Sequence, residues 1–416
     1  MGRLIFHVDV NSAFLSWEAA RRVREGGEDL RLIPSCISGD PKKRTSIILA
    51  KSIPAKQYGI KTGEPIGMAL QKCRDLVIAP PDFKLYEQCS HAFTEICRSF
   101  APKVEKFSID ECFLDMSNTD QLYPDPIQTA HRLKDAIRDT LGFTVNVGIG
   151  PNKLLAKMAS DFEKPDKVHT LFANELEEKF FPLAVSDLIS VGRGSVEKLE
   201  RCRIKTIGDL ARYDVQALQK LMGRKFGQQL HDYANGHDPS PVEGQNRDAK
   251  GYSISTTLES DLVSSKDAQA LLFNLTDHVA LRMRADAARA GCVSVTIRTT
   301  DFKDRSHQRH LTEPCDITEE LYQTVKQLFE ELWDRQTPLR LLGVSLTQIM
   351  HDGAEQMSLF PDPQKEKERK IDKTMDALRS RYGMHAIARG SIGTPSEHIG
   401  RKQRARFEEK QNKETK

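Results

Sequence analysis

The sequence FSIDECFLD at residues 107–115 sets two adjacent carboxylates, Asp110 and Glu111, between two short apolar runs. Neighbouring side chains on a straight strand point to opposite faces, so both can serve one site only where a turn falls beside them. Adjacent carboxylates repel each other and are costly to bury, and a nearby cation offsets that cost. The stretch therefore predicts a hairpin whose carboxylates hold a divalent ion, or else an exposed, salt-bridged hairpin tip.

A third carboxylate, Asp9, follows the apolar run at residues 4–8. On its own, Asp9 predicts a cap for a helix that begins near Ser12, or a carboxylate bound to a cation. Together with Asp110 and Glu111 it forms a set of hard oxygen ligands, which favours magnesium with substrate phosphates completing the shell. Two such ions about 3.5–4 Å apart can stabilise the attacking and leaving oxygens of an in-line displacement.

Apolar runs and helical stripes alternate through the first 165 residues. The runs predict strands at 3–10, 45–50, 75–79, 103–109, 112–117 and 143–150. Apolar residues three and four apart predict helices at 12–24, 83–100, 126–140 and 152–162. This alternation is typical of an α/β domain, and a mostly helical stretch follows it at 166–240.

The second half of the chain has a different pattern. A polar segment with prolines and a glycine at 237–250 predicts a linker. Residues 251–350 follow the order β-α-β-β-α-β, a ferredoxin-like plan within an α+β domain. Farther on, residues 361–370 predict a solvated charged run, 370–383 one more helix, and the charged end a disordered tail.

Composition narrows the class of protein. Of 416 residues, 38% are hydrophobic and the net charge is +3, so the chain can bury cores and any basic surface must be local. Eight scattered cysteines without a CxxC pair argue against a zinc site and a disulfide framework, and fit a reducing cytosol. No apolar run reaches about 18 residues and the N-terminus lacks a signal-peptide pattern, so we expect no membrane association.

Four ordered motifs are similar to those of one known family. DVNSAFLSWE at 9–18, PAKQYGIKTG at 54–63, SIDE at 108–111 and VGIGPNKLLAKMASDFEKP at 147–165 closely resemble the Y-family, or translesion, DNA polymerases. The resemblance covers roughly residues 3–350. It implies a right-hand fold of palm, fingers and thumb, with an added ferredoxin-like little finger.

The resemblance also implies domain boundaries. These are palm and fingers at 1–165, with the fingers at about 20–80; a thumb with a helix-hairpin-helix at 166–236; a linker at 237–250; the little finger at 251–350; and a clamp-binding motif with a charged tail at 351–416.

The roles implied by the resemblance begin with the metal site. Asp9, Asp110 and Glu111 resemble the catalytic ligands of two Mg²⁺ ions, for which Mn²⁺ can substitute, and the carbonyl of Val10 would join them. Asp9 and Asp110 would bridge both ions, and Glu111 would serve the ion at the primer terminus.

The triphosphate would meet the start of the first helix. The backbone N–H groups of Asn11, Ser12, Ala13 and Phe14 would face the phosphates. Phe14 matches the aromatic steric gate that excludes a ribose 2′-hydroxyl, although a core aromatic is the alternative interpretation.

Basic residues of the fingers and palm resemble the family's nucleotide contacts less uniformly. Lys164 matches well, and Lys56 stands where many relatives have arginine. Lysine still binds phosphate, but as a point charge without the bidentate fork. Ile53 replaces a tyrosine that often bonds the phosphates.

Other matches concern DNA and a partner protein. Gly192 and Gly194 would frame the thumb hairpin around Arg193, where relatives usually have an aliphatic residue. Arg298 of the little finger would contact the DNA backbone, and ordinary surface charge is the alternative. The pentapeptide Gln356, Met357, Ser358, Leu359 and Phe360 resembles the bacterial sliding-clamp-binding motif. The alternative is a segment that packs back on the body.

These features predict a template-directed, low-fidelity polymerase that bypasses lesions by two-metal phosphoryl transfer. Expected partners are primer-template DNA, deoxynucleoside triphosphates and a β-type sliding clamp; we expect a monomer in the cytoplasm, associated with the nucleoid. The alternatives are a catalytically silent DNA- and clamp-binding accessory protein in mutagenesis, and a metal-dependent nuclease or cyclase with a palm-like domain. The complete set of three carboxylates argues against the accessory protein, and the linked little finger and clamp motif argue against the nuclease or cyclase.

Overall fold

The structure is a computed structural model that describes residues 2–244, 248–351, 363–384 and 386–389. The chain divides into two compact units, one formed by residues 1–39 and 47–246 and the other by residues 40–46 and 247–416. Among the helices that are described, none has the length and apolar character needed to cross a membrane.

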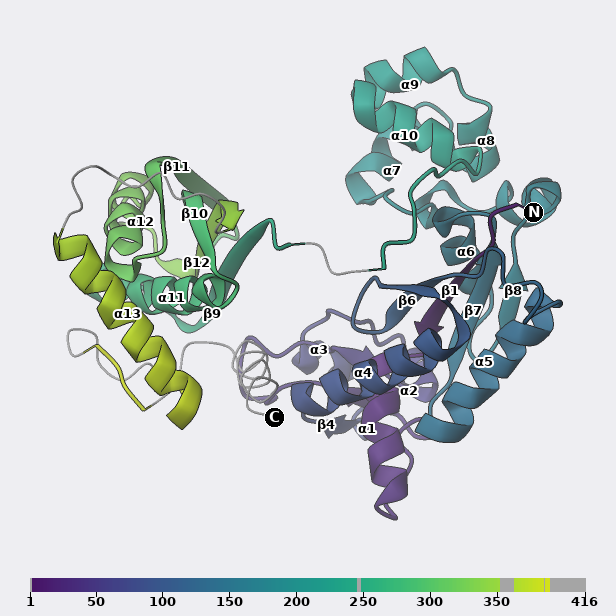
Figure 1. Cartoon of the computed structure of the whole chain (residues 1–416), viewed down its shortest axis with the longest axis horizontal. Helices are drawn as coiled ribbons and strands as arrows, with labels where there is room; N and C mark the ends of the chain where they lie inside the picture. Colours follow the sequence, from purple (N-terminus) through teal and green to yellow (C-terminus); the bar gives the residue numbers. More distant parts are fainter. Residues whose placement is uncertain (1, 245–247, 352–362, 385, 390–416) are drawn as a thin grey trace. The chain divides into compact units, whose positions relative to one another are not determined.

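A five-stranded sheet is the centre of the first unit, in the order β5-β6-β1-β7-β8, and Figure 1 labels β6, β1, β7 and β8 of it. Its strands are β1 (Ile5–Val10), β5 (Lys103–Lys106), β6 (Glu111–Asp115), β7 (Val145–Gly150) and β8 (Val168–Thr170). Every residue of β1 is buried because the strand lies between β6 and β7 and is covered on both faces. The predicted α/β palm is therefore observed.

The two faces of this sheet have different partners. Phe6, Val8 and Val10 belong to the main core, together with residues of three helices: α1 (Ala13–Arg24), α4 (Phe83–Phe100) and α5 (Pro126–Leu141). The alternate residues of β1 point the other way. There Ile5 packs with Ala156 of α6 (Lys153–Ser160), and His7 bonds Ser160 of the same helix.

Two glycines of β7 set the distance between the sheet and α6. A Cβ atom at Gly148 would lie 1.9 Å from the carbonyl oxygen of Ala156, and one at Gly150 would lie 2.8 Å from the Ala156 nitrogen. Only glycine allows this backbone-to-backbone approach. The helix α6 is thus held closely over the end of the sheet that carries Asp9.

A small second sheet, in the order β3-β2-β4, lies within the range expected for the fingers. Its elements are β2 (Ser35–Ile37), β3 (Ala50–Lys51), α2 (Ile53–Gln57), α3 (Ile66–Lys72) and β4 (Val77–Ala79). The predicted strand at 45–50 is wrong except for Ala50, because only an isolated bridge at Ile47 precedes β3. The short strand β2 was not predicted.

The helical region after β8 packs around an apolar core that it shares with Leu154, Leu155, Met158 and Ala159 of α6. Its main helices are α7 (Arg193–Arg201), α8 (Ile207–Ala211), α9 (Val215–Met222) and α10 (Arg224–Ala234), preceded by three short 3₁₀ or π turns at Ala173–Glu175, Leu176–Phe180 and Val185–Asp187. The first half of the linker expected at 237–250 packs against the first unit. The Asp238 carboxylate accepts from the N–H of Leu154, and Val242 is buried beside Phe113.

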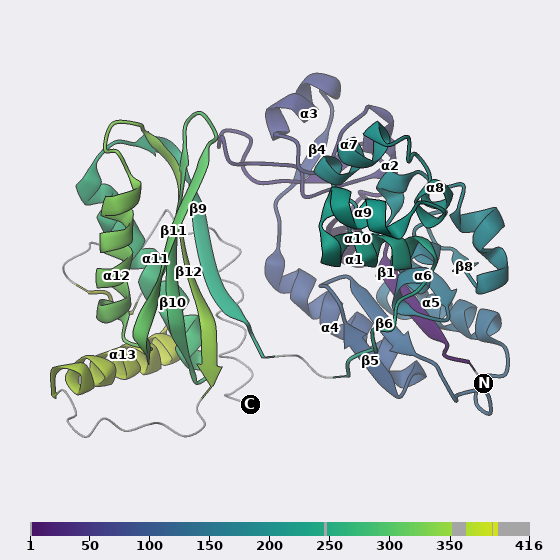
Figure 2. The same cartoon turned by 90° about the horizontal axis from the view of Figure 1, so that it is seen from above.

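The second unit has the predicted β-α-β-β-α-β order. Its elements are β9 (Gly251–Leu262), α11 (Ser265–Ala285), β10 (Ala288–Thr299), β11 (Asp304–Cys315), α12 (Thr318–Leu332) and β12 (Leu339–His351). The strands lie in the order β11-β10-β12-β9, each antiparallel to its neighbour. Figure 2 shows α11 and α12 on one face of this sheet, where their apolar stripes meet its core.

A final helix, α13 (Pro363–Tyr382), begins seven residues earlier than the helix predicted at 370–383. Its charged first half does not exclude helix formation, because Lys365 pairs with Glu320 and Arg369 pairs with Asp316. Residues 361 and 362 of the charged run, like the end of the chain, lie outside the described part.

Candidate active site

Strand pairing brings two of the three predicted carboxylates together. In the antiparallel pair of β1 and β6, Asp9 lies directly opposite Glu111. The N–H groups of Phe107 and Ser108 both donate to the carbonyl of Glu111 and close the hairpin, so Asp110 lies in the bend before β6. The turn that the sequence required beside this pair is confirmed.

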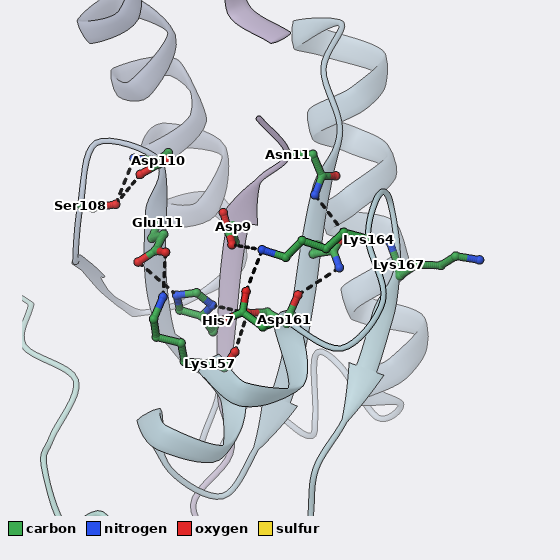
Figure 3. A network of polar contacts seen from close by, with 12 residues as sticks. His7, Asp9, Asn11, Ser108, Asp110, Glu111, Lys157, Asp161, Lys164 and Lys167 are labelled. Carbon is green, nitrogen blue, oxygen red and sulfur yellow. Dashed lines mark hydrogen bonds and ion pairs between the residues drawn. The ribbon is translucent and has the colours of Figure 1, made fainter. Parts of the chain in front are cut away.

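The bend also joins the end of β1. The N–H of Val10 donates to the carbonyl of Asp110 at 3.0 Å. The Asp110 carboxylate turns to its own loop, where Ser108 Oγ donates to Oδ1 at 2.6 Å (Figure 3). Within the described residues, no three His, Cys, Asp or Glu side chains are grouped closely enough to hold a metal ion. The backbone thus gathers the three carboxylates, while the Asp110 side chain faces Ser108.

Asp9 is a buried carboxylate with a lysine partner. Lys164 contacts both Asp9 and Asp161, and the dashed lines in Figure 3 mark both ion pairs. Burial raises the pKa of Asp9 to about 6, although the charge of Lys164 acts in the opposite direction. The carboxylate lies where a stronger positive charge would stabilise its ionised form.

Glu111 has two basic neighbours. Its Oε1 is 2.7 Å from Lys157 Nζ, and its Oε2 is 3.7 Å from His7 Nε2. Burial opposes ionisation, yet these neighbours lower the pKa of Glu111 to about 2. Glu111 is therefore a carboxylate at neutral pH.

The donor chemistry of this site fits magnesium. Directly opposed residues of antiparallel strands have Cβ atoms about 4.5–5.5 Å apart, a separation that small cations can bridge through carboxylate oxygens. Asp9 and Glu111 are such a pair, and Asp110 follows in the adjoining bend. The site offers oxygen ligands on a rigid strand pair, whereas sulfur ligands, typical of softer metals, are absent from this set.

The start of α1 differs in one respect from expectation. The N–H of Asn11 donates to the carbonyl of Thr144, so it does not face a triphosphate. The Asn11 side chain bonds Asn146, and Ser12 adopts a left-handed conformation before the helix. The N–H groups of Ala13 and Phe14 belong to the first turn, whose donors have no partners within the helix.

Phe14 is half-buried and is held by other aromatic rings. It stacks on Tyr86 at 4.4 Å with an interplanar angle of 8°, and it meets Phe83 edge-on at 6.2 Å. Tyr86 and Phe83 belong to α4, far along the chain. Sequence reasoning missed Tyr86, because nothing in its local pattern distinguishes it from a core aromatic.

The other residues with predicted roles in binding nucleotide or DNA belong to α2, to the start of α7 and to β10. Lys56 is exposed on α2, and Gly192 and Gly194 are exposed at the start of α7 with open space around them. Arg298 of β10 forms two hydrogen bonds, at 2.6 and 2.8 Å, with Asp304 across the hairpin. The pentapeptide at 356–360 lies outside the described residues.

Comparisons with known proteins place this geometry in a family. Residues 8–161 match the model of the impB/mucB/samB family, residues 249–359 match the C-terminal domain of that family, and residues 186–238 match a DNA polymerase-iota thumb domain. DNA polymerase IV of Clostridium acetobutylicum is 41% identical over 393 residues, which are 94% of this chain and 98% of that protein. The chain belongs to the Y family of DNA polymerases.

Further relatives agree with this membership. DNA polymerase IV of Clostridium kluyveri is 35% identical over 401 residues, covering 94% of this chain and 98% of that protein. A solved chimera of the Y-family polymerases Dbh and Dpo4 matches with a TM-score of 0.74 at 22% identity, over 84% of this chain and all of that one, which supports the fold. The chain is a DNA-directed DNA polymerase of the translesion type.

Proposed function

We propose that this Y-family polymerase joins a deoxynucleotide to a primer 3′ end at Asp9, Asp110 and Glu111, with two Mg²⁺ ions, or Mn²⁺ in their place. The β1–β6 register, with Asp9 opposite Glu111 and Asp110 in the bend, is the observation that carries the proposal. The ions, when bound, supply Lewis-acid stabilisation of the attacking and leaving oxygens. Primer extension by wild type and Asp110→Ala tests the assignment.

The residues around the carboxylates would bind and orient the substrates. Lys164, beside Asp9, would meet the triphosphate, and Lys56 would add a point charge from α2. The first-turn N–H groups of Ala13 and Phe14 would contact phosphate oxygens. Positioning of this kind, rather than a covalent intermediate, is how a polymerase lowers the barrier.

DNA contacts are proposed for the exposed glycines and for Arg298. Open space around Gly192 and Gly194 lets a phosphate approach the backbone N–H groups at the start of α7. Arg298 would release Asp304 and bond a phosphate of the DNA backbone instead. We further propose that the enzyme acts as a monomer in the cytoplasm, associated with the nucleoid.

Phe14 is proposed as the gate that selects deoxyribose. The rings of Tyr86 and Phe83 hold it in place, so a ribose 2′-hydroxyl would meet an aromatic side chain that cannot retreat. Overpacking of a rigid site costs about 1–3 kcal/mol, so Phe14→Ala should raise ribonucleotide insertion relative to deoxynucleotide insertion by about 5- to 150-fold. Single-nucleotide insertion with both sugars measures this ratio.

The control for the gate is Phe100→Ala. Phe100 stacks on Tyr123 at 6.1 Å and makes no ring contact with Phe14 in the described structure, so sugar selection should not change. An unchanged ratio in Phe14→Ala would refute the gate and leave Phe14 as a core aromatic.

We propose that residues 356–360 bind a β-type sliding clamp. The motif follows β12, which ends at His351, and precedes α13, which begins at Pro363. Leu359→Ala with Phe360→Ala should abolish stimulation of primer extension by the clamp and leave unstimulated synthesis unchanged, because the apolar pair would fill the clamp pocket. Primer extension with and without clamp measures both.

The matched control for the clamp motif is a double change on the exposed face of α13, Lys367→Ala with Lys370→Ala. We expect this variant to keep full stimulation by the clamp. Stimulation that survives in the Leu359→Ala, Phe360→Ala variant would show that the motif packs elsewhere.

A further inference from the structure

Glu111 is held from α6 by Lys157. Lys157 Nζ lies 2.7 Å from Glu111 Oε1, and both side chains are largely buried, with 16% and 18% exposed. At 3.7 Å, the second neighbour, His7 Nε2, is too far away for a hydrogen bond. Lys157 is therefore the side chain that bonds the Glu111 carboxylate directly in the described structure.

The position of Lys157 is itself fixed. Gly148 and Gly150 let α6 approach the sheet so closely that any Cβ atom there would collide with the helix backbone. The ammonium of Lys157 also lies 5.5 Å from the centre of the Phe107 ring, an aromatic residue at the start of the hairpin bend. A rigid helix thus presents this lysine to the first residue of β6.

His7 connects the same helix to β1 beneath Glu111. Ser160 Oγ donates to the carbonyl of Lys157 at 2.8 Å and also lies 2.8 Å from His7 Nδ1. The fully buried His7 ring lies 4.6 Å from the Phe113 ring. His7 is therefore fixed near Oε2 of Glu111, whereas Lys157 bonds Oε1.

We propose that Lys157 is a positioning residue for Glu111. By bonding Oε1 it holds the carboxylate in one orientation beside the His7 ring, and it does not touch the nucleotide. The proposal rests on the proposed role of Glu111 as a metal ligand. A glutamate side chain has three torsions, and fixing them beforehand removes an entropy cost from the step that uses the carboxylate.

The first measurement is metal binding without DNA or nucleotide. Mn²⁺ titration of Lys157→Met, followed by electron paramagnetic resonance, should show affinity about 10- to 100-fold weaker than wild type, as for other partners that orient metal ligands. Loss of a positive charge alone would act in the opposite direction and tighten binding. Affinity that is unchanged or tighter would overturn the proposal.

The matched control is Lys153→Met. Lys153 lies one turn earlier on α6, is 14% exposed, and pairs with Glu105 at 2.7 Å in the way that Lys157 pairs with Glu111. The Lys153→Met substitution removes the same charge from the same helix and leaves the bond to Glu111 intact, so Mn²⁺ affinity should stay at wild-type level or rise. Lys157→Arg keeps a cation in place and should recover most of the lost affinity.

The second measurement separates positioning from nucleotide binding. In single-nucleotide insertion, Lys157→Met should lower kcat about 10- to 100-fold and leave the KM for the deoxynucleotide within about twofold of wild type. In a Glu111→Gln background, Lys157→Met should add no further loss. A raised KM with unchanged kcat, or full additivity, would contradict the proposal. Should Lys157→Met fold poorly by thermal melting, Lys157→Gln supplies the neutral variant.

Failure of this inference differs from failure of the proposed function. Activity that survives Asp110→Ala would remove the metal assignment itself. If Lys157→Met behaves like Lys153→Met while Asp110→Ala is inactive, only the positioning role of Lys157 is lost.

Discussion

Asp110→Ala is expected to lower the rate of single-nucleotide insertion by about three orders of magnitude, because it removes a proposed ligand of both metal ions. Lewis-acid stabilisation at a metal centre contributes several kcal/mol to the transition state, and about 4 kcal/mol corresponds to a 10³-fold change in rate. The measurement is single-turnover insertion of a deoxynucleotide, with kcat and KM determined separately on an undamaged and a lesion-containing template.

The control for this prediction is Asp115→Ala. Asp115 is a half-buried carboxylate at the other end of β6, where it accepts from the N–H of Ser117 at 3.0 Å. It lies opposite Ile5 rather than opposite Asp9, so it has no place in the proposed metal site. Its loss should change the rate by no more than about threefold. Substantial synthesis by Asp110→Ala would contradict the assignment of the carboxylates.

The sequence predicted the hairpin of this site because the requirement was local. Two adjacent carboxylates can serve one site only beside a turn, and the bend before Glu111 supplies it. The direction of the Asp110 side chain was not predictable, since it depends on the bond with Ser108 two residues earlier. The bond from Lys157 of α6 to Glu111 of β6 was also missed. It depends on the close approach of α6 to the sheet, which Gly148 and Gly150 of β7 allow.

The fold shows the same division between local and distant information. Helices such as α4 (Phe83–Phe100) and α5 (Pro126–Leu141) agree with the predicted ranges to within a residue, because their apolar spacing is strong. The strand predicted at 45–50 largely failed, because an apolar run of six residues does not by itself determine a sheet partner. Composition identified α13 as polar and could not indicate that some of its charges are buried by pairing.

The docking of α13 rests on buried ion pairs with α11. Arg379 is 2% exposed and lies 2.8 Å from the Asp277 carboxylate, and Arg284 lies 2.6 Å from the Asp376 carboxylate. The Asp372 carboxylate accepts from the N–H of Thr318 at 2.8 Å, so a residue of α13 caps the start of α12. These contacts make α13 a structural part of the second unit.

Arg379→Ala should therefore destabilise the second unit by about 3–5 kcal/mol, because it leaves the Asp277 carboxylate buried without its partner. Denaturant unfolding of the full chain, followed through the fluorescence of Trp333 in a Trp17→Phe background, reports on this unit. Trp333 is nearly buried in the core of this unit, whereas Trp17 belongs to the first unit. The transition of the second unit is analysed separately, since a chain of two units need not unfold in one step.

Two further variants decide whether the loss of stability in Arg379→Ala comes from breaking its ion pair with Asp277 or from the loss of side-chain volume. Arg381→Ala removes an exposed arginine from the same helix and should change stability by less than about 0.5 kcal/mol. Asp277→Ala combined with Arg379→Ala removes both charges and should cost clearly less than the sum of the single changes, because neither charge is then left unpaired. Additive losses would instead mean that the two side chains stabilise the unit independently through packing, and that α13 is held chiefly by its buried apolar residue Met375.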